Sequence, residues 1–414
     1  MLGTLPRSKG TINSTARQGP AESTATGGGE AMQTKLFDHY FDDTHCALRA
    51  EIRKFVQAEI SPRAQEFEEN ESFDYELYAK VGGLGFLGVS YPSAYGGGDG
   101  DIFHSVVMTE ELIRGGSTGT AVGLGSLQIA LPPILKLGSE EQKERFIPPV
   151  IKGEKVAALA VTEPSTGSDV AGVRTKAEKT DQGFVINGSK TFITSGVRAD
   201  YLMVLARTSE DPHFGLTFFL VEKDFPGVSV SRALKKTGWH ASDTAELFFE
   251  NVTVPESHRI GQLGSGFLAL MNNFETERLL LAIQGNTLAE MAFDEAAKYS
   301  QERQAFGRPI GKFQVNKHKL AEMATKIQTS KAMTYLVADA MNQGKAYMQD
   351  VAMAKNHAAQ MACDVTWEAQ QIFGGMGYMR ECLVERLFRD ARILPIGGGT
   401  HEIMNEIIAK NLGL

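Results

Sequence analysis

The chain has 414 residues, of which 42% are hydrophobic and 22% charged, and its formal net charge is −8. The length suggests about 2–4 domains, the negative charge argues against nucleic acid as the main partner, and no apolar run approaches the about 20 residues of a membrane span. Cys46, Cys363 and Cys382 are widely spaced, which indicates neither a disulfide framework nor a metal site and favours a reducing compartment.

Residues 1–33 are predicted to form a disordered extension. Residues 1–31 are rich in Ser, Thr, Gly and Ala, lack aromatic residues and show no hydrophobic period. We favour a start at Met32, with the preceding residues an extension and the protein in a bacterial cytoplasm. The alternative is an organelle transit peptide, which would place the protein in the mitochondrial matrix, although an Arg-rich amphipathic stretch is missing.

Residues 34–157 are predicted to form an N-terminal α-helical domain. Asp43 or Thr44 is expected to cap its first long helix, and helical patterns separated by Gly and Pro clusters continue to about residue 155. Apolar residues of that first helix recur with the spacing of one helix face, at Leu48, Ile52, Phe55, Val56 and Ile60.

The stretch "GLGFLG" at 83–88 matches the glycine pattern of a dinucleotide-binding loop. Such a loop requires a strand before it and a helix after it, whereas the preceding "FDYELYAKVG" has a helical pattern. We therefore interpret the stretch as the glycine-rich end of a helix and not as a nicotinamide site.

In residues 158–265 the helical pattern is replaced by short segments of the kind that form β-strands. "YLMVLART", "LTFFLVEKD" and "AELFFENVTV" are rich in aromatic and β-branched residues and are bounded by turn residues. Asn187-Gly188, in "GFVINGSKTFI", is the strongest short signal for a hairpin turn. We predict an antiparallel, β-barrel-like middle domain.

Residues 266–414 return to a helical period, with long periodic stretches at 265–301, 314–343, 346–373 and 400–412. Long helices packed side by side predict a C-terminal four-helix bundle. The predicted fold class is therefore α+β, with the order helical domain, β-domain, helical bundle.

One carboxylate interrupts an apolar helix stripe in "GFLALMNNFETERLLLA". Glu277 falls between Phe274 and Leu281 of the stripe, and its i+3 and i+4 neighbours are leucines, so no local cation neutralises it. Burial would raise its pKa, which suits a general base. Two alternatives remain, because the stripe could border water or Glu277 could meet an Arg or Lys from another helix. The stripe consists of Phe267, Leu270, Phe274 and Leu281.

Further segments occur in order along residues 34–414. They are "AVTEPSTGSDVAG" at 160–172, "SKTFITSG" at 189–196, "ERQAFGRPIGKFQ" at 302–314, "QIFGGMGY" at 371–378 and "RDARILPIGGGTHEI" at 389–403. Together they resemble the motifs of the acyl-CoA dehydrogenase family. The resemblance implies the α–β–α fold, FAD as cofactor, and removal of two hydrogens across Cα–Cβ of a fatty acyl thioester, as in fatty acid β-oxidation.

The resemblance implies that Glu277 is the catalytic base. Many family members carry Glu at the position of Gly398, where this chain has no carboxylate. Members such as the isovaleryl-CoA and long-chain dehydrogenases carry it at the position of Glu277. The Gly398 N–H is then implied to hold the substrate carbonyl oxygen together with a ribityl hydroxyl of FAD, and glycine permits the close approach. Thr400 is expected to cap the helix that follows.

The remaining site residues are also implied by resemblance. Arg278 is implied to contact CoA, although Glu275 is its natural helix partner, Phe192 replaces a usual Trp, and Glu402 replaces a usual Gln. The substrate-binding positions are Ser168, Phe274, Arg278, Gly398 and Gly399. The FAD-binding positions are Val161, Thr162, Ser168, Phe192, Ile193, Thr194, Arg303, Phe306, Gln314, Gln371, Gly374, Gly375, Thr400 and Glu402.

The family also implies partners. They are a fatty or branched acyl-CoA substrate, electron transfer flavoprotein as the electron acceptor, and further copies of the chain in a homotetramer whose FAD sites lie across subunit contacts. Two rival functions are a flavin oxidase that passes electrons to oxygen and a non-catalytic FAD-binding protein. The preferred acyl chain length cannot be read from any motif.

Overall fold

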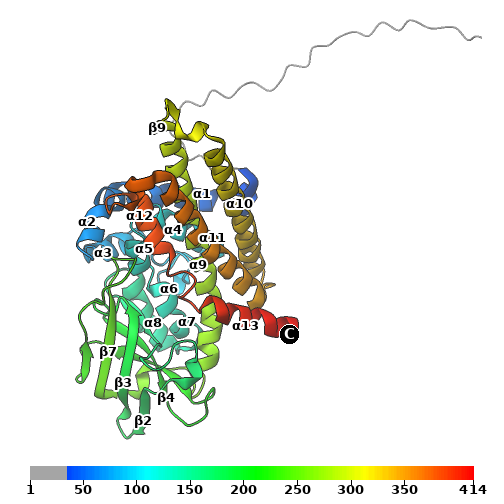
Figure 1. The fold of residues 1–414 in the computed structure, drawn as a ribbon. Coiled ribbons are helices and arrows are strands. Elements are labelled where there is room, and N and C mark those ends of the chain that lie inside the picture. The colour runs from blue at the N-terminus through cyan, green and yellow to red at the C-terminus, as the bar shows by residue number, and fades with distance from the viewer. Residues whose placement is uncertain (1–34) are drawn as a thin grey trace, which may run out of the picture.

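The computed structural model describes residues 35–414, so the predicted N-terminal extension lies outside the described residues. N-terminal helices, a β-sheet and C-terminal helices follow one another along the chain, which confirms the predicted order. The sheet occupies one end of the molecule, and α9 (Gly266–Glu302) runs from that end to the other (Figure 1).

The N-terminal part is helical, as predicted. The cap of its first long helix is Asp42, whose carboxylate accepts hydrogen bonds from the backbone N–H groups of Thr44 and His45, so the expectation of Asp43 or Thr44 was wrong by one or two residues. The helix α3 ends at Gly83, which confirms that "GLGFLG" closes a helix. The helices are α1 (Asp43–Phe55), α2 (Ala64–Glu69), α3 (Glu76–Gly83), α4 (Ile102–Ile113), α5 (Thr118–Leu124), α6 (Leu127–Ala130), α7 (Pro132–Leu137) and α8 (Glu140–Ile151).

The middle part is one open, mixed sheet, so the prediction of an antiparallel, barrel-like domain was wrong in two respects. The strand order is β6-β7-β3-β2-β4-β5-β8 with β1 also paired to β4, and both β1 and β2 run parallel to β4. The strands are β1 (Ala157–Ala160), β2 (Lys176–Thr180), β3 (Gly183–Thr194), β4 (Tyr201–Arg207), β5 (Leu216–Glu222), β6 (Val228–Val230), β7 (Thr244–Val254) and β8 (Arg259–Ile260).

Asn187-Gly188 is not a hairpin turn, because β3 runs through it. The pairing of β3 with β7 shifts between Ile186 and Gly188, which marks a β-bulge. The Asn187 side chain accepts a hydrogen bond from the Asn251 N–H of β7, at 2.8 Å. The amide therefore joins two strands, and the chain turns earlier, between β2 and β3.

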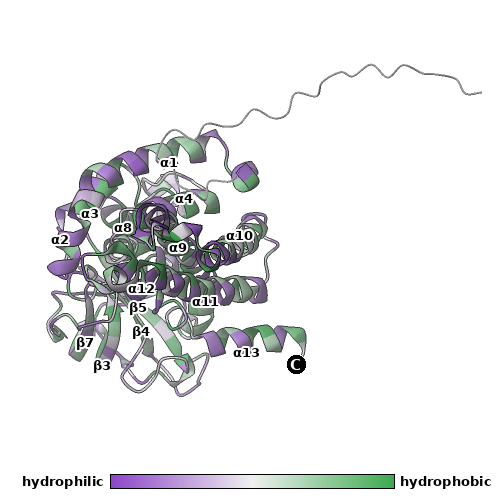
Figure 2. Ribbon diagram, turned by 45° about the horizontal axis from the view of Figure 1, so that its top comes forward, coloured by the Kyte–Doolittle hydropathy of each residue, from purple (hydrophilic) through white to green (hydrophobic). Residues whose placement is uncertain are grey.

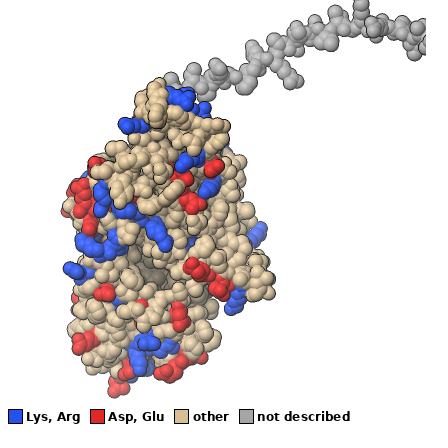
Figure 3. Space-filling view, in the orientation of Figure 1, with Lys and Arg blue, Asp and Glu red and all other residues tan. Residues whose placement is uncertain are grey.

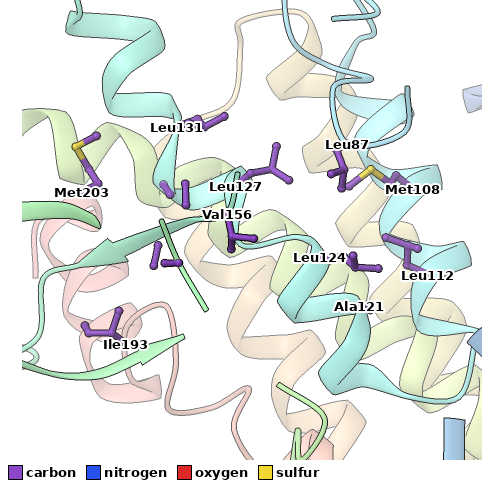
Figure 4. Close-up of a cluster of buried hydrophobic side chains, with 14 of the residues drawn as sticks. Leu87, Met108, Leu112, Ala121, Leu124, Leu127, Leu131, Val156, Ile193 and Met203 are labelled. Atoms are coloured by element: carbon purple, nitrogen blue, oxygen red, sulfur yellow. The ribbon is translucent and has the colours of Figure 1, made fainter. Parts of the chain in front are cut away.

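The N-terminal helices and the sheet share one hydrophobic core. Leu124 and Leu127, from two helices, belong to the same buried cluster as Val156 and Ile193 of the middle part (Figure 4). Hydrophobic and hydrophilic residues alternate along the helices, as α1 and α13 show (Figure 2). This shared core fixes the end of β3, which carries predicted cofactor residues, against the helical part.

The C-terminal part consists of long helices packed on α9. An added Cβ at Gly285 of α9 would lie 3.0 Å from the Ala358 carbonyl oxygen, so glycine permits close packing with α11. The helix α13 contacts α11 and projects from the body of the molecule (Figure 1). The helices are α10 (Gln314–Asn342), α11 (Met348–Phe373), α12 (Leu383–Ala391) and α13 (His401–Leu412), with a small hairpin of β9 (Gln304–Ala305) and β10 (Arg308–Pro309) after α9.

In the described part of the chain, no single helix is long and apolar enough to cross a membrane. The bent pair of Thr118–Leu124 and Leu127–Leu137 passes that test by length and composition, and many of its side chains are buried in the core.

Candidate active site

Glu277 lies on the face of α9 that meets the glycine-rich loop at 397–399. An added Cβ at Gly398 would be 3.6 Å from Oε1 of Glu277 and only 2.4 Å from Cδ1 of Leu281. The Oε2 atom of Glu277 is inaccessible to solvent and has no hydrogen-bond partner. The sequence stripe therefore places an unpartnered carboxyl group directly beside the loop.

Burial raises the pKa of Glu277 to about 7, although the positive charges of Arg278 and Lys355 oppose the rise. The expected direction of the pKa shift is thus confirmed. Glu277 as a whole is half-buried, but its Oε2 atom is shielded from water. Lys355 of another helix acts on it through its charge, and Glu277 forms no ion pair within residues 35–414. A carboxyl group with this pKa can accept a proton near neutral pH.

The loop beside Glu277 is held by two buried cations. Nε of Arg278 donates to the Gly398 carbonyl oxygen at 3.0 Å, and Nζ of Lys355 donates to the Gly399 carbonyl oxygen at 2.7 Å. Gly398 and Gly399 have φ angles of +64° and +99°, a region that favours glycine. Within the described chain, the N–H of Gly398 has no acceptor, so it is available to a ligand.

Thr400 caps α13, as predicted, with its hydroxyl accepting a hydrogen bond from the Ile403 N–H at 3.3 Å. Glu402 follows in the first turn of that helix and is exposed. A negative group in the first helix turn is favourable, so Glu402 has a structural explanation besides its implied contact with FAD.

Arg278 does not pair with Glu275. The residue is buried, its guanidinium lies 5.2 Å from the centre of the Phe274 ring, and its described hydrogen bond is the one to Gly398. The structure therefore gives Arg278 a role in supporting the loop. Its implied contact with CoA stays a prediction.

The end of β3 presents an aromatic ring and a hydroxyl group. Phe192 sits at a second irregularity of the β3–β7 pairing with φ +58° and is 68% exposed. Thr194 is partly exposed, and its hydroxyl has no partner in the described chain. Ile193 points the opposite way, into the core (Figure 4), so only its backbone can meet a cofactor. An exposed ring beside a free hydroxyl fits a flavin ring system.

A buried ion pair ties the segment from Val161 to β3. Nζ of Lys190 donates to Oε1 of Glu163 and to the Val161 carbonyl oxygen, both at 2.9 Å. The same carboxylate accepts from the backbone N–H groups of Arg174 and Thr175, both at 2.8 Å. This pair holds two implied flavin segments together.

The other implied residues of this segment differ in exposure. Val161 is buried, Thr162 is partly exposed and Ser168 is exposed. The Thr162 carbonyl oxygen accepts a hydrogen bond from the Thr191 N–H at 2.8 Å, which adds a second link to β3.

The other implied FAD residues lie far from Glu277. Arg303 follows α9, and at 1.5 Å per residue it is about 39 Å along the helix axis from Glu277. Tyr299 and Phe373 stack with ring centroids 4.2 Å apart, which joins the far ends of α9 and α11. The implied cofactor residues at this end are all exposed, Phe306 to 95%, and comprise Arg303, Phe306, Gln314, Gln371, Gly374 and Gly375.

Sequence reasoning missed Lys190 and Lys355, which are both fully buried. A signal for Lys355 existed, because it continues a stripe of small and apolar residues on α11. The stripe has spacings of four, three and four residues and consists of Val351, Lys355, Ala358 and Ala362.

One face of the molecule is hollowed between the helical half and the β-domain, and Lys and Arg side chains gather above the hollow (Figure 3). Positive groups at such a site suit a ligand that carries phosphates.

Three consecutive segments match the domains of the acyl-CoA dehydrogenase family. Residues 42–154 match its N-terminal domain, 158–252 its middle domain and 264–413 its C-terminal domain. The chain is 37% identical over 398 residues to the mitochondrial long-chain specific acyl-CoA dehydrogenase of Sus scrofa, which covers 94% of this chain and 92% of that protein. It is 39% identical over 392 residues to the mitochondrial isovaleryl-CoA dehydrogenase of Oryza sativa subsp. japonica, which covers 93% and 96%.

Solved structures share the fold. The acyl-CoA dehydrogenase from Geobacillus kaustophilus has a TM-score of 0.87 at 38% identity, over 91% of this chain and 99% of that one. A glutaryl-CoA dehydrogenase from Mycobacterium smegmatis in complex with FADH2 has a TM-score of 0.86 at 26% identity, over 91% and 96%. The chain therefore belongs to the acyl-CoA dehydrogenase family and is an FAD-dependent oxidoreductase.

Proposed function

We propose that this enzyme converts a fatty or branched acyl-CoA to its trans-2-enoyl-CoA, with Glu277 as the base that removes the α-proton. The observation that carries the proposal is the unpartnered carboxyl of Glu277 beside the free N–H of Gly398. A base and an oxyanion donor on one small site are what deprotonation next to a thioester carbonyl requires.

The residues of the chain have separate tasks in this reaction. The Gly398 N–H donates a hydrogen bond to the thioester oxygen, which makes the α-proton more acidic. Glu277 holds that proton after its transfer, and burial keeps its Oε2 atom out of water. Bound FAD supplies, at its N5 atom, the acceptor for the β-hydride.

We also propose that the enzyme works as a homotetramer and passes electrons to an electron transfer flavoprotein. Support for an oligomer comes from the implied FAD residues at the far end of α9, because Arg303 lies about 39 Å along the helix axis from Glu277. One extended cofactor cannot reach both these residues and Glu277 within one chain, whereas a neighbouring copy can bring the far residues of one subunit to the Glu277 of another.

Anaerobic titration of the holoenzyme with straight and branched acyl-CoA thioesters tests the reaction. We expect flavin absorbance to bleach with at least one thioester, and more slowly when its α-hydrogens are deuterium. No bleaching with any thioester would favour a non-catalytic FAD-binding protein. Rapid reoxidation of the reduced enzyme by air, without electron transfer flavoprotein, would favour an oxidase.

A further inference from the structure

We propose that Lys355 is a positioning residue that holds the 398–400 loop in its reactive conformation and keeps positive charge behind Glu277. The inference rests on the proposed function for its catalytic part, but the hold on the loop is a property of the chain itself. Lys355 lies on α11, is fully buried and donates to the Gly399 carbonyl oxygen at 2.7 Å.

The next residue on α11 extends the hold. Nδ2 of Asn356 donates to the His401 carbonyl oxygen and to Oδ1 of Asn405, both at 3.0 Å. Arg278 holds the Gly398 carbonyl oxygen from the opposite helix, α9. The carbonyl groups at 398, 399 and 401 are thus fixed from two long helices.

The loop needs such support because of its composition. Gly397, Gly398 and Gly399 have no side chains that could pack, and glycine loses more conformational freedom on ordering than any other residue. Peptide groups are planar, so fixing two successive carbonyl oxygens also fixes the planes of the peptides that carry them. The first of these planes contains Cα of Gly398, so holding it limits the movement of the Gly398 N–H, which belongs to the preceding peptide.

Lys355 also acts through its charge. The charged groups that influence this site are Glu277 and Arg278 on α9, Lys355 on α11 and Glu402 on α13. The positive charge of Lys355 opposes the rise in the pKa of Glu277. Burial, and then Arg278, lowers the pKa of Lys355 itself to about 8, against the opposing effect of Glu277 and Glu402.

A buried lysine could instead serve only to pack α11 against α9. The two roles differ in pH dependence, because loss of packing lowers the rate equally at every pH. Loss of the charge raises the pKa of Glu277, so a higher pH is needed before the base is ionised.

The test compares Lys355→Met, which keeps the length without the charge, with Lys355→Arg and with Lys331→Met. Lys331 forms a shielded ion pair with Glu290, and Glu290 keeps Arg114 as a partner when Lys331 is replaced. Lys331→Met is therefore a matched control for loss of a shielded lysine outside the site.

The first readout is the anaerobic rate of flavin reduction by acyl-CoA between pH 6 and 9.5, measured on FAD-loaded enzyme. We expect the acidic limb of the Lys355→Met profile to shift to a pH that is higher by about one unit. At pH values where Glu277 is mostly protonated, the rate is then about tenfold lower than in the wild type. Lys355→Arg keeps the acidic limb of the wild type, because it keeps the positive charge. Lys331→Met keeps the wild-type profile.

The second readout is hydrogen exchange of backbone amides in residues 394–404 without substrate. Faster exchange in Lys355→Met than in Lys355→Arg supports the hold on the loop, even if no acyl-CoA reduces the wild-type flavin and the proposed function fails. Wild-type exchange together with an unshifted pH profile in Lys355→Met overturns the inference. A rate lowered equally at every pH, with unchanged exchange, also overturns it.

Discussion

Glu163 and Glu277 are both shielded carboxylates in segments implied to bind FAD or substrate, and their environments differ in one respect. Burial alone would raise the pKa of Glu163, but the charge of Lys190 and hydrogen bonds from Thr175 outweigh burial, and the pKa is lowered. Glu277 has no ion-pair partner in the described chain, so burial prevails and its pKa rises to about 7. Burial therefore raises the pKa of a carboxyl group only where no close cation or hydrogen-bond donor offsets it, and this condition holds for Glu277 but not for Glu163.

The partners come from different distances along the chain. Glu163 is satisfied by residues 11 to 27 positions away, in the same β-domain. Glu277 instead meets α11 and the loop before α13, which come much later in the chain. Arg278, next to Glu277, lies 120 residues before the Gly398 that it holds, and Lys355 lies 44 residues before Gly399. The local arrangement can serve stability, whereas the long-range one exists only when the C-terminal helices are packed.

The largest expected effect is a loss of activity when Glu277 is replaced. Glu277→Gln should bind FAD and lower the anaerobic rate of flavin reduction by acyl-CoA about 10²–10⁴-fold, because an amide cannot accept the α-proton. Stopped-flow absorbance measures the rate. Glu275→Gln, on the same helix, serves as the control and should reduce at a near-normal rate. Near-normal reduction by Glu277→Gln would reject the assignment of the base.

What the sequence could predict was local. The order of the domains, the main strand runs, the Thr400 cap and the stripe with Glu277 follow from periodicity and turn residues that lie close together. The prediction of a turn at Asn187-Gly188 was wrong because β3 pairs with β2 on one side and with β7 on the other, and the dipeptide forms a bulge within this sheet. Whether the sheet is open or closed into a barrel also could not be predicted from the sequence, because it depends on which strands that are distant in the chain pair with one another.

The site shows the same limit. A raised pKa was predictable for Glu277 from its leucine neighbours, but the hold of Lys355 on Gly399 was not. A buried lysine is visible in sequence only as a break in an apolar stripe, and the stripe does not say which carbonyl the lysine reaches. The implied roles of the FAD-binding residues at the far end of α9 stay predictions.

The next largest effect is on stability, and it is expected for Glu163 and not for Glu277. Glu163→Gln should destabilise the holoenzyme by about 3–5 kcal/mol, because it leaves Lys190 buried without a counter-charge. Calorimetric unfolding measures the loss, and the ratio of flavin to protein absorbance should fall as the 161–163 segment loosens from β3. An unfolding temperature equal to that of the wild type would mean that Lys190 is satisfied without Glu163.

A smaller effect tests whether the pair acts as a unit. Lys190→Met combined with Glu163→Gln should be more stable than Glu163→Gln alone, because the unpaired cation is removed. Calorimetry of the two single variants, the double variant and the wild type gives the coupling free energy. Additive losses would show that Lys190 and Glu163 are energetically independent, despite their 2.9 Å contact.

The smallest effect is a pH-dependent gain in stability from Glu277→Gln. The folded pKa of Glu277 is about 7 against an ordinary value of 4.5, so between these values the unfolded chain releases a proton that the folded protein keeps. Folding stability of the wild type therefore falls from about pH 4.5 to 7 and levels off above.

Glutamine has no such titration, so calorimetry should show the unfolding temperatures of variant and wild type diverging over that range. The gap corresponds to less than about 3 kcal/mol, since Glu277 is partly exposed. Asp390, whose pKa burial and Glu68 raise to about 7, titrates in the same range in both proteins, and subtraction removes its contribution. A gap that stays constant from pH 5 to 8 would mean that Glu277 is solvated or paired in solution, and it would then no longer differ from Glu163 in the way that makes it a base.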